Sequence, residues 1–419
     1  MSVGRLALRG LTRNRRRSLA TLLAIAFGFA ALSLFAGYTR NVYNGLQRQA
    51  IYGELLGHLT IEHRGLRTLG KLDPERYLLS GTDVARIAAL VQSEPHVKLV
   101  APRLGISGLA SNGRASTIFI ADGISPQAMD ALQRNALTPE QLRSGRYAAV
   151  IKKLDPAHPD TVLLSQGLAD MLDLKKGDTF ALLTNTVSGQ ANALDATVGG
   201  TFNTGNAGTN DKFVFMPLAL AQSLYDSRGG ADRLTVLLDD AGRTAAVRAR
   251  LLARLRAAGY DVEIESWRDL SAFYNQVHQM FDMIFGFIFC IVLTVVVMSV
   301  ANSMGMTVVE RTREIGTLRA IGLKRGGVVR LFALESLLLS LCGVAAGLGL
   351  ALAVRYGVNA ADISYVPPNG AGAVPLQVDW DGARIAFAAA MLLAVGVLAA
   401  YFPARRAARQ PVIDALGHV

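Results

Sequence analysis

The chain has 419 residues, of which 51% are hydrophobic and only 18% are charged, and its formal net charge is +11. Soluble domains contain about 25% charged residues. The apolar excess gathers in four stretches without any charge, each close to or above the roughly 20 residues that a membrane-spanning helix needs: 18–39, 283–309, 336–354 and 385–404. This composition excludes a purely soluble enzyme, a nucleic-acid-binding domain and a disordered chain.

The positive charge is concentrated in three short segments. Residues 1–18, 304–330 and 403–419 together hold 15 basic and three acidic residues, whereas 38–282 is nearly neutral, with 26 basic and 25 acidic residues. Because short cationic loops stay in the cytoplasm, we expect all three segments to be cytoplasmic. The positive charge therefore primarily indicates the topology of the chain in the inner (plasma) membrane. Contact with anionic lipid heads is a secondary consequence.

The predicted fold class is membrane α plus α+β. It has four transmembrane helices in a one-plus-three arrangement, with a large α+β extracytoplasmic domain between the first and second. The expected order is a cytoplasmic N-terminus 1–18, helix 19–39, extracytoplasmic domain with helical stalks 40–282, helix 283–303, cytoplasmic coupling segment 304–330, helix 331–354, outer loop 355–384, helix 385–402 and cytoplasmic tail 403–419.

The first span resembles a signal peptide in its preceding arginines. However, its apolar run of 18 residues (19–36) exceeds the usual 7–15, and no small-residue cleavage site follows. We therefore expect an uncleaved anchor. Helical spacing in 40–52 and 271–282 predicts that two helices continue out of the membrane as a stalk; two unrelated interfacial helices are the alternative.

The segment 40–282 has mixed local signals. Asn112-Gly113 between two apolar runs predicts a β-hairpin. Helical spacing predicts a helix over 84–91, capped by Thr82 or Asp83. The remaining expectations are helices at 163–174, 218–225 and 241–258, strands at 179–183, 213–216, 234–238 and 262–264, and a loop over 185–210 with one strand near 196–198.

Nothing in the sequence indicates that the chain catalyses a reaction. It contains no G-x-x-x-x-G-K-[ST] loop and no clustered Cys/His set, and its six histidines are scattered. The two cysteines, Cys290 and Cys342, lie in predicted spans, so we expect no disulfide framework in 40–282. We accordingly expect no catalytic residue, no metal and no cofactor on this chain.

The segment 309–323 joins the second and third spans. Ile315, Leu318 and Ile321 recur at helical spacing with charges on the other side, and Gly322 is expected to end the helix. An amphipathic interfacial helix with snorkelling arginines is the alternative to a docking helix.

The third span contains Gly343 and Gly347, a spacing that lets helices approach closely in lipid. Packing within the chain and a dimer contact both remain open. Glu335 lies near the cytoplasmic end of this span, and we expect it to snorkel or to pair with Arg330.

Three runs resemble the MacB/FtsX permease family: MTVVERTREIGTLRAIGLKRGGVVRLFALES, YFPARRAARQPVIDALG and LRGLTRNRRRSLATLLAIAFGFAAL. The resemblance implies a non-catalytic membrane subunit of an ABC transporter, paired with a second copy or a paralogue. A separate ATPase subunit would bind ATP and magnesium, and a short helix would dock on it. The implied coupling residues are Glu310, Arg311, Arg313, Glu314, Ile315, Leu318, Arg319, Ala320 and Gly322.

Segments 57–61, 101–126 and 163–183 are similar to the lipoprotein-releasing LolC/LolE-type branch. This similarity implies lipoprotein or lipid cargo and a periplasmic acceptor. FtsX-like regulation of cell-wall hydrolases and MacB-like efflux of drugs or peptides are the alternatives.

Overall fold

The computed structural model describes residues 15–70, 72–135, 152–205, 207–366 and 373–412. The chain forms two compact units, which we describe separately. Unit 1 comprises Met1–Asn44, Val277–Ser364 and Pro375–Val419; unit 2 comprises Gly45–Gln276 and Tyr365–Val374.

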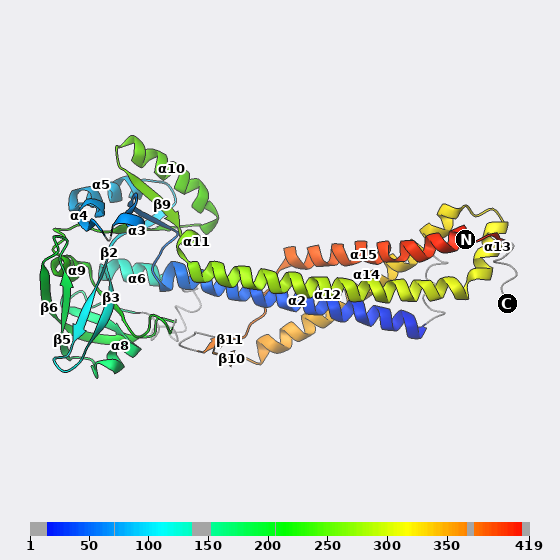
Figure 1. Ribbon diagram of the computed structural model, residues 1–419, viewed down its shortest axis with the longest axis horizontal. Helices are drawn as coiled ribbons and strands as arrows, with labels where there is room; N and C mark the ends of the chain where they lie inside the picture. Colours follow the sequence, from blue (N-terminus) through cyan, green and yellow to red (C-terminus); the bar gives the residue numbers. More distant parts are fainter. Residues whose placement is uncertain (1–14, 71, 136–151, 206, 367–372, 413–419) are drawn as a thin grey trace. The chain divides into compact units, whose positions relative to one another are not determined.

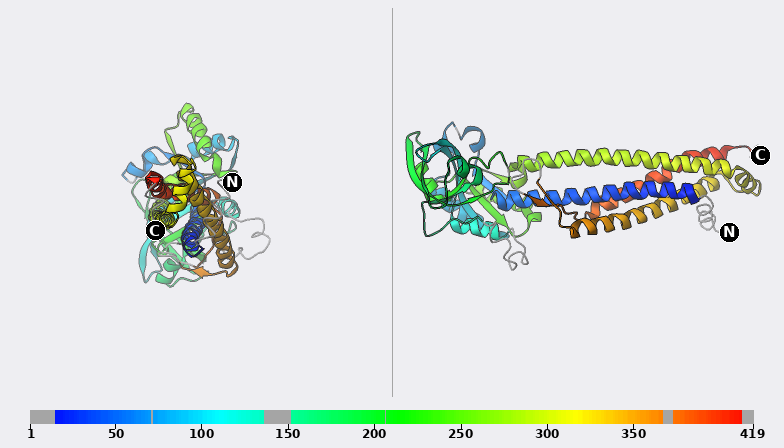
Figure 2. Two further views of the ribbon diagram at one scale, coloured as in Figure 1. Left: turned by 90° about the vertical axis from the view of Figure 1, so that its right-hand side faces the viewer. Right: turned by 90° about the horizontal axis from the view of Figure 1, so that it is seen from below.

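Four long helices dominate unit 1, where they run side by side (Figures 1 and 2): α2 (Arg15–Arg48), α12 (Ala272–Glu310), α14 (Arg325–Ala360) and α15 (Gly382–Arg409). Each is long and apolar enough to cross a membrane, and no other helix in the described ranges is. The predicted fold class is confirmed. The helices exceed the predicted spans. Of the segments expected to form a stalk, α12 covers 272–282 and α2 covers 40–48, after which η1 (Gln49–Gly53) follows.

The helices of unit 1 pack through apolar side chains and through glycines. Ile25, Phe29, Val300 and Phe332 lie in the shared core. A Cβ added at Gly347 would lie 2.5 Å from the carbonyl oxygen of Ala26 in α2, and Gly343 faces α2 in the same way. The small-residue face of α14 therefore lies against α2 of the same chain.

Six strands of unit 2 close into a barrel. Neighbours pair in the order β3-β7-β4-β6-β5-β2, and β2 also pairs with β3, which closes the ring. The barrel core contains Phe119, Val162, Leu164 and Phe180. The strands are β2 (Val97–Ser111), β3 (Ser116–Ile124), β4 (Thr161–Ser165), β5 (Thr179–Asn185), β6 (Ala191–Phe202) and β7 (Phe213–Pro217).

The sheet continues from β2 through three more strands: β8 (Arg233–Leu238), β1 (Leu59–His63) and β9 (Val262–Ser266). Helices α5 (Gly81–Gln92) and α10 (Thr244–Ala257) bury Ile87 and Leu251 against these strands. The smaller elements are η1 (Gln49–Gly53), α3 (Leu66–Leu69), α4 (Pro74–Tyr77), α6 (Pro126–Arg134), α8 (Gln166–Met171), α9 (Leu218–Tyr225), η2 (Ala241–Arg243), α11 (Trp267–Leu270), β10 (Ser364–Tyr365) and β11 (Val374–Pro375).

The hairpin at Asn112-Gly113 and the helix over 218–225 are confirmed. Three local predictions need correction. Residues 163–174 are not one helix, because the first three complete strand β4 inside the barrel before α8 begins. Residues 185–210 do contain the strand expected near 196–198, but it is longer than expected, because β6 takes twelve residues between β4 and β5. The cap of α5 is Ser80, whose hydroxyl accepts from the Asp83 amide, rather than Thr82 or Asp83.

Candidate functional site

The predicted coupling residues lie in and around one short helix, α13 (Thr312–Ala320), between α12 and α14 (Figure 1). The chain bends at Arg311, whose φ of −109° and ψ of 14° interrupt the helical geometry. The C-terminal end is closed at Gly322, where φ is +105°. The amides of Gly322 and Leu323 donate to the carbonyls of Arg319 and Leu318. This is the Schellman arrangement that a glycine favours, so the predicted helix stop is present.

The inner face of α13 is fixed to unit 1 by apolar contacts. Ile315 is buried in the same core as Val328 of α14 and Ala404 of α15. Gly316 is buried as well. Thr312 is buried, and its hydroxyl donates to the Val308 carbonyl at 2.9 Å. Helix α13 therefore packs against the ends of the long helices and is not a free loop.

A buried charge network joins α13 to α14. The Arg311 guanidinium donates to Glu335 Oε1 at 2.7 Å and to Glu314 Oε2 at 2.9 Å. The Glu335 side chain is only 3% exposed, whereas that of Glu314 is 44% exposed. The predicted pairing of Glu335 with Arg330 is wrong. Residues five apart on a helix point about 140° away from each other, so Arg330 faces outward while Glu335 faces α12.

Two further predicted residues attach the neighbouring segments. Glu310, the last residue of α12, pairs with Arg17 of α2. Arg319 donates to the backbone carbonyl of Gln410, just beyond α15. Glu310 and Arg319 thus bind within unit 1, as do Arg311 and Ile315. The side chains of these four residues therefore hold α13 in place and do not present it to a partner.

The outer face of α13 carries the remaining groups. Arg313, Thr317 and Ala320 are exposed at helical spacing on one side. Ile321 was expected on the apolar face, but it is 79% exposed because α13 ends at Ala320 and the chain turns at the next residue. We call these four residues the α13 outer face. Leu318 is half-buried at its edge.

Sequence reasoning missed a second buried network, in unit 2. Arg103 of β2 is 1% exposed and binds Asp122 of β3, with Nε 3.0 Å from Oδ1. Arg233 of β8 reaches the same carboxylate at 2.8 Å. Arg103 also donates to the backbone carbonyls of Glu54 and Leu55, which directly follow η1. We call this set the Arg103 network; it ties the chain that leaves α2 to the sheet.

Burial perturbs the groups around the Arg103 network. It lowers the pKa of Lys152 to about 8, while the neighbouring Glu54 acts in the opposite direction. Burial also raises the pKa of Glu54. The Lys152 ammonium donates to the Gly53 carbonyl at 3.2 Å and lies 4.6 Å from the centre of the Phe202 ring. Both groups therefore lie at the turn after α2.

The described residues contain no group of three or more His, Cys, Asp and Glu side chains placed to hold a metal ion. Cys290 and Cys342 are free and exposed. The expectation that this chain carries no cofactor stays a prediction.

Two family models match the chain almost end to end. Residues 18–254 match the MacB-like periplasmic core domain, and residues 286–412 match the FtsX-like permease C-terminal domain. The chain belongs to the MacB/FtsX permease family. The first match covers more than half of the chain, and the second includes the whole of α13.

The chain is similar in sequence to several known proteins. The pyoverdine export ATP-binding/permease protein PvdT of Pseudomonas putida is 28% identical over 415 residues, which are 96% of this chain and 57% of that protein. The macrolide export ATP-binding/permease protein MacB of a Shewanella species is 23% identical over 436 aligned residues, covering 98% of this chain and 60% of that protein. The chain therefore spans about three fifths of these relatives.

Among solved structures, the periplasmic region of MacB from Actinobacillus actinomycetemcomitans is 14% identical, with a TM-score of 0.34. The match covers 54% of this chain and 95% of that one.

Proposed function

We propose that this permease is the membrane subunit of an ABC exporter, and that a separate ATPase binds the α13 outer face from the cytoplasm. The observation that carries the proposal is the division of α13 into two faces. Its inner face is fixed by Ile315 and by the Arg311–Glu335 pair, while Arg313 and Ile321 are presented to solvent. An exposed large apolar side chain beside an arginine is typical of the centre of a protein interface.

The orientation follows from charge. The segments 304–330 and 403–419 are basic, and short basic loops remain in the cytoplasm. Unit 2 would then lie outside the inner membrane, and ATP-driven movement of α13 would reach it through α2 and α12. Two permease chains, identical or paralogous, would pair around one transport path.

Export of a small amphipathic molecule is our first choice of cargo, because the relatives are named for pyoverdine and macrolide export. Release of lipoproteins or lipids is the second candidate; it rests on the similarity of segments 57–61, 101–126 and 163–183 to the lipoprotein-releasing branch. Depletion of this protein in cells distinguishes the candidate functions. Drug or siderophore sensitivity would favour efflux, trapped lipoproteins would favour release, and a cell-separation defect alone would favour FtsX-like regulation.

The docking step can be tested without knowing the cargo. The permease chain is co-purified with a candidate ABC-type ATPase, and binding and ATP turnover are measured for Arg313→Glu and Ile321→Asp. Because truncating an interface hot spot costs about 2 kcal/mol or more, we expect at least a tenfold loss of affinity for each. Arg330→Glu is the matched control: it makes the same charge change at an exposed position of α14.

Equal losses for Arg313→Glu and Arg330→Glu would mean that only the overall charge attracts the ATPase. Unchanged binding in Ile321→Asp would likewise contradict docking on the α13 outer face.

A further inference from the structure

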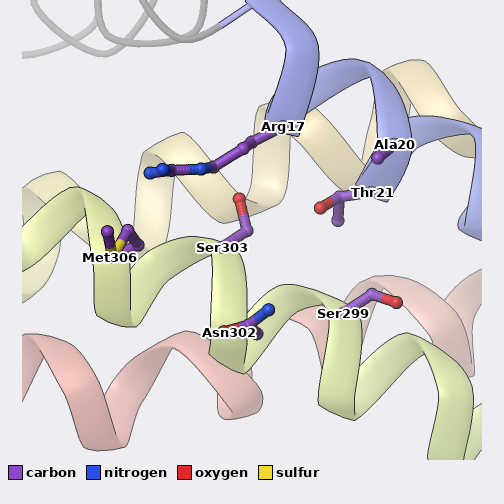
Figure 3. A pocket seen from close by; sticks show the side chains of 7 residues that line it. All are labelled: Arg17, Ala20, Thr21, Ser299, Asn302, Ser303 and Met306. Carbon is purple, nitrogen blue, oxygen red and sulfur yellow. The ribbon is translucent and has the colours of Figure 1, made fainter.

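A cavity opens between α2 and α12 near their ends closest to α13. The two helices touch farther along, where a Cβ added at Gly28 would lie 2.7 Å from Val292 Cγ1. They diverge from that point and leave a space of about 370 Å³. Figure 3 shows its lining side chains, among them Arg17 and Thr21 from α2 and Ser299, Asn302, Ser303 and Met306 from α12.

The polar groups of this cavity lie in a stretch that is otherwise apolar. In the part of the chain that the structure describes, the side chains of Ser299, Asn302 and Ser303 have no hydrogen-bond partner. Hydrocarbon offers none either, so such groups in a membrane-spanning helix are expected to be satisfied by protein, water or a polar ligand. An amide and two hydroxyls supply donors suited to oxygen acceptors such as ester carbonyls.

A cation stands at the mouth of the cavity. Arg17 pairs with Glu310 through Nη1, and a guanidinium carries further N–H groups that can bind a phosphate at the same time. Farther along the helices from α13, exposed apolar side chains follow: Leu23 and Phe27 on α2, and Met298 and Val295 on α12. Along the helix axes the order is therefore a cation, hydrogen-bond donors and then apolar side chains.

This order matches an amphiphile with an anionic head, ester groups and long acyl chains. We propose that the cavity binds the head of an anionic glycerophospholipid, with its phosphate on Arg17 and its ester region at Asn302 and Ser303. A second copy of the chain is the competing occupant of this surface.

The test uses the purified full-length chain in a neutral detergent, without ATPase or cargo, so that its result is independent of the proposed exporter function. Native mass spectrometry measures retention of phosphatidylglycerol against phosphatidylcholine with the same acyl chains. We expect preferential retention of phosphatidylglycerol by the wild type. Arg17→Gln should weaken it about tenfold, because hydrogen bonds to charged groups are the strong ones. Arg16→Gln, an equal charge change at an exposed residue outside the cavity, should not.

A second pair of variants changes shape instead of charge. Ser303→Leu fills the cavity and should also abolish the preference for phosphatidylglycerol. Thr294→Leu places the same side chain on an exposed part of α12 away from the cavity and should leave it intact. Glu310→Gln removes an acid that competes for Arg17 and should raise retention.

Three results would overturn the proposal. Equal losses in Arg17→Gln and Arg16→Gln would indicate only general attraction of anionic lipid to the basic end. Retention that is unchanged in Ser303→Leu would place the lipid elsewhere. A dimer that dissociates in Ser303→Leu but not in Thr294→Leu, with no lipid preference, would assign the cavity to a second copy.

Discussion

The Arg311 network provides the sharpest test of how α13 is held. In Arg311→Met, the Glu335 carboxylate keeps its place between helices, 3% exposed, but loses the one ion-pair partner that it has among the described residues. Removing one member of a buried ion pair costs about 3–5 kcal/mol, because the other charge is left uncompensated. Arg311 is itself 13% exposed, so we expect the lower end, about 3 kcal/mol.

The assay is unfolding of the full-length chain in mixed detergent micelles by increasing SDS, followed by helical circular dichroism. Arg311→Met should shift the midpoint strongly, and Arg311→Met/Glu335→Met should recover most of the loss, because an apolar pair replaces both charges. Glu314→Gln is the control: it removes the other acid bound to Arg311, but at a 44% exposed position, so its effect should stay within about 1 kcal/mol.

The reasoning would be refuted if the double variant lost as much as the sum of the Arg311→Met and Glu335→Met losses. Additive losses would mean that the two side chains do not depend on each other. An Arg311→Met midpoint equal to that of Glu314→Gln would mean that the pair is effectively at the surface.

Three further predictions concern packing and titration. Gly347→Val should reduce the stability of unit 1 by about 2 kcal/mol or more in the same assay, because the new side chain would overlap the Ala26 carbonyl of α2. Arg103→Met should destabilise unit 2 by about 3 kcal/mol, the lower end of the range for breaking a buried ion pair, since buried Asp122 would lose Arg103 but keep Arg233. Burial lowers the pKa of His58 to about 4, from an ordinary value of 6.5. The unfolded chain takes up a proton below pH 6.5 and the folded chain does not, so unit 2 should lose about 3 kcal/mol between pH 6.5 and pH 4.

Each of these predictions has a matched control. Gly349→Val should be tolerated, because a Cβ at that position meets nothing within 4 Å. Unit 2 can be followed by the fluorescence of buried Trp267 in a Trp380→Phe background. The pH dependence should disappear in His58→Asn but persist in His158→Asn, whose ring is 67% exposed. A loss between pH 6.5 and 4 that survives in His58→Asn would assign the titration to another group, and an Arg103→Met midpoint equal to the wild type would show that the network contributes no stability.

The membrane helices were predictable because their signal is local. A run such as 18–39 without charge has few alternatives to a spanning helix, and basic flanks add direction. The barrel of unit 2 was not predictable in the same way. The Gly-, Asn- and Thr-rich segment around strand β6 predicts a loop with only a short strand near 196–198, but backbone pairing with β4 and β5 extends that strand over Ala191–Phe202. Such pairings join residues far apart in sequence.

For the candidate site, too, local signals were predictable and contacts between distant residues were not. The spacing of Ile315 and Gly322 located α13 and its end correctly, because both signals act within one helix. The partner of Glu335 is not the one expected because nearness in sequence favours Arg330, whereas the chain bends at Arg311 and the side chain of Arg311 reaches Glu335 of α14. No sequence signal marked Arg103, a lone arginine after a proline whose role depends on a turn almost fifty residues away.

The proposed relay depends on α2 remaining helical where it leaves unit 1, and Gly45 allows this to be tested at a single position. A Cβ added there meets nothing within 4 Å, so substitution creates no clash. Gly45→Ala should keep or strengthen the helix, because glycine costs about 1 kcal/mol relative to alanine in a helix interior. Gly45→Pro removes an amide donor and clashes with the preceding turn, which breaks or kinks a helix at about 3 kcal/mol. With ATPase binding and Trp267 fluorescence unchanged in both variants, export in cells should fall at least tenfold in Gly45→Pro only. Normal export by Gly45→Pro would mean that movement reaches unit 2 without a rigid α2, since the only difference between the two variants is the continuity of that helix.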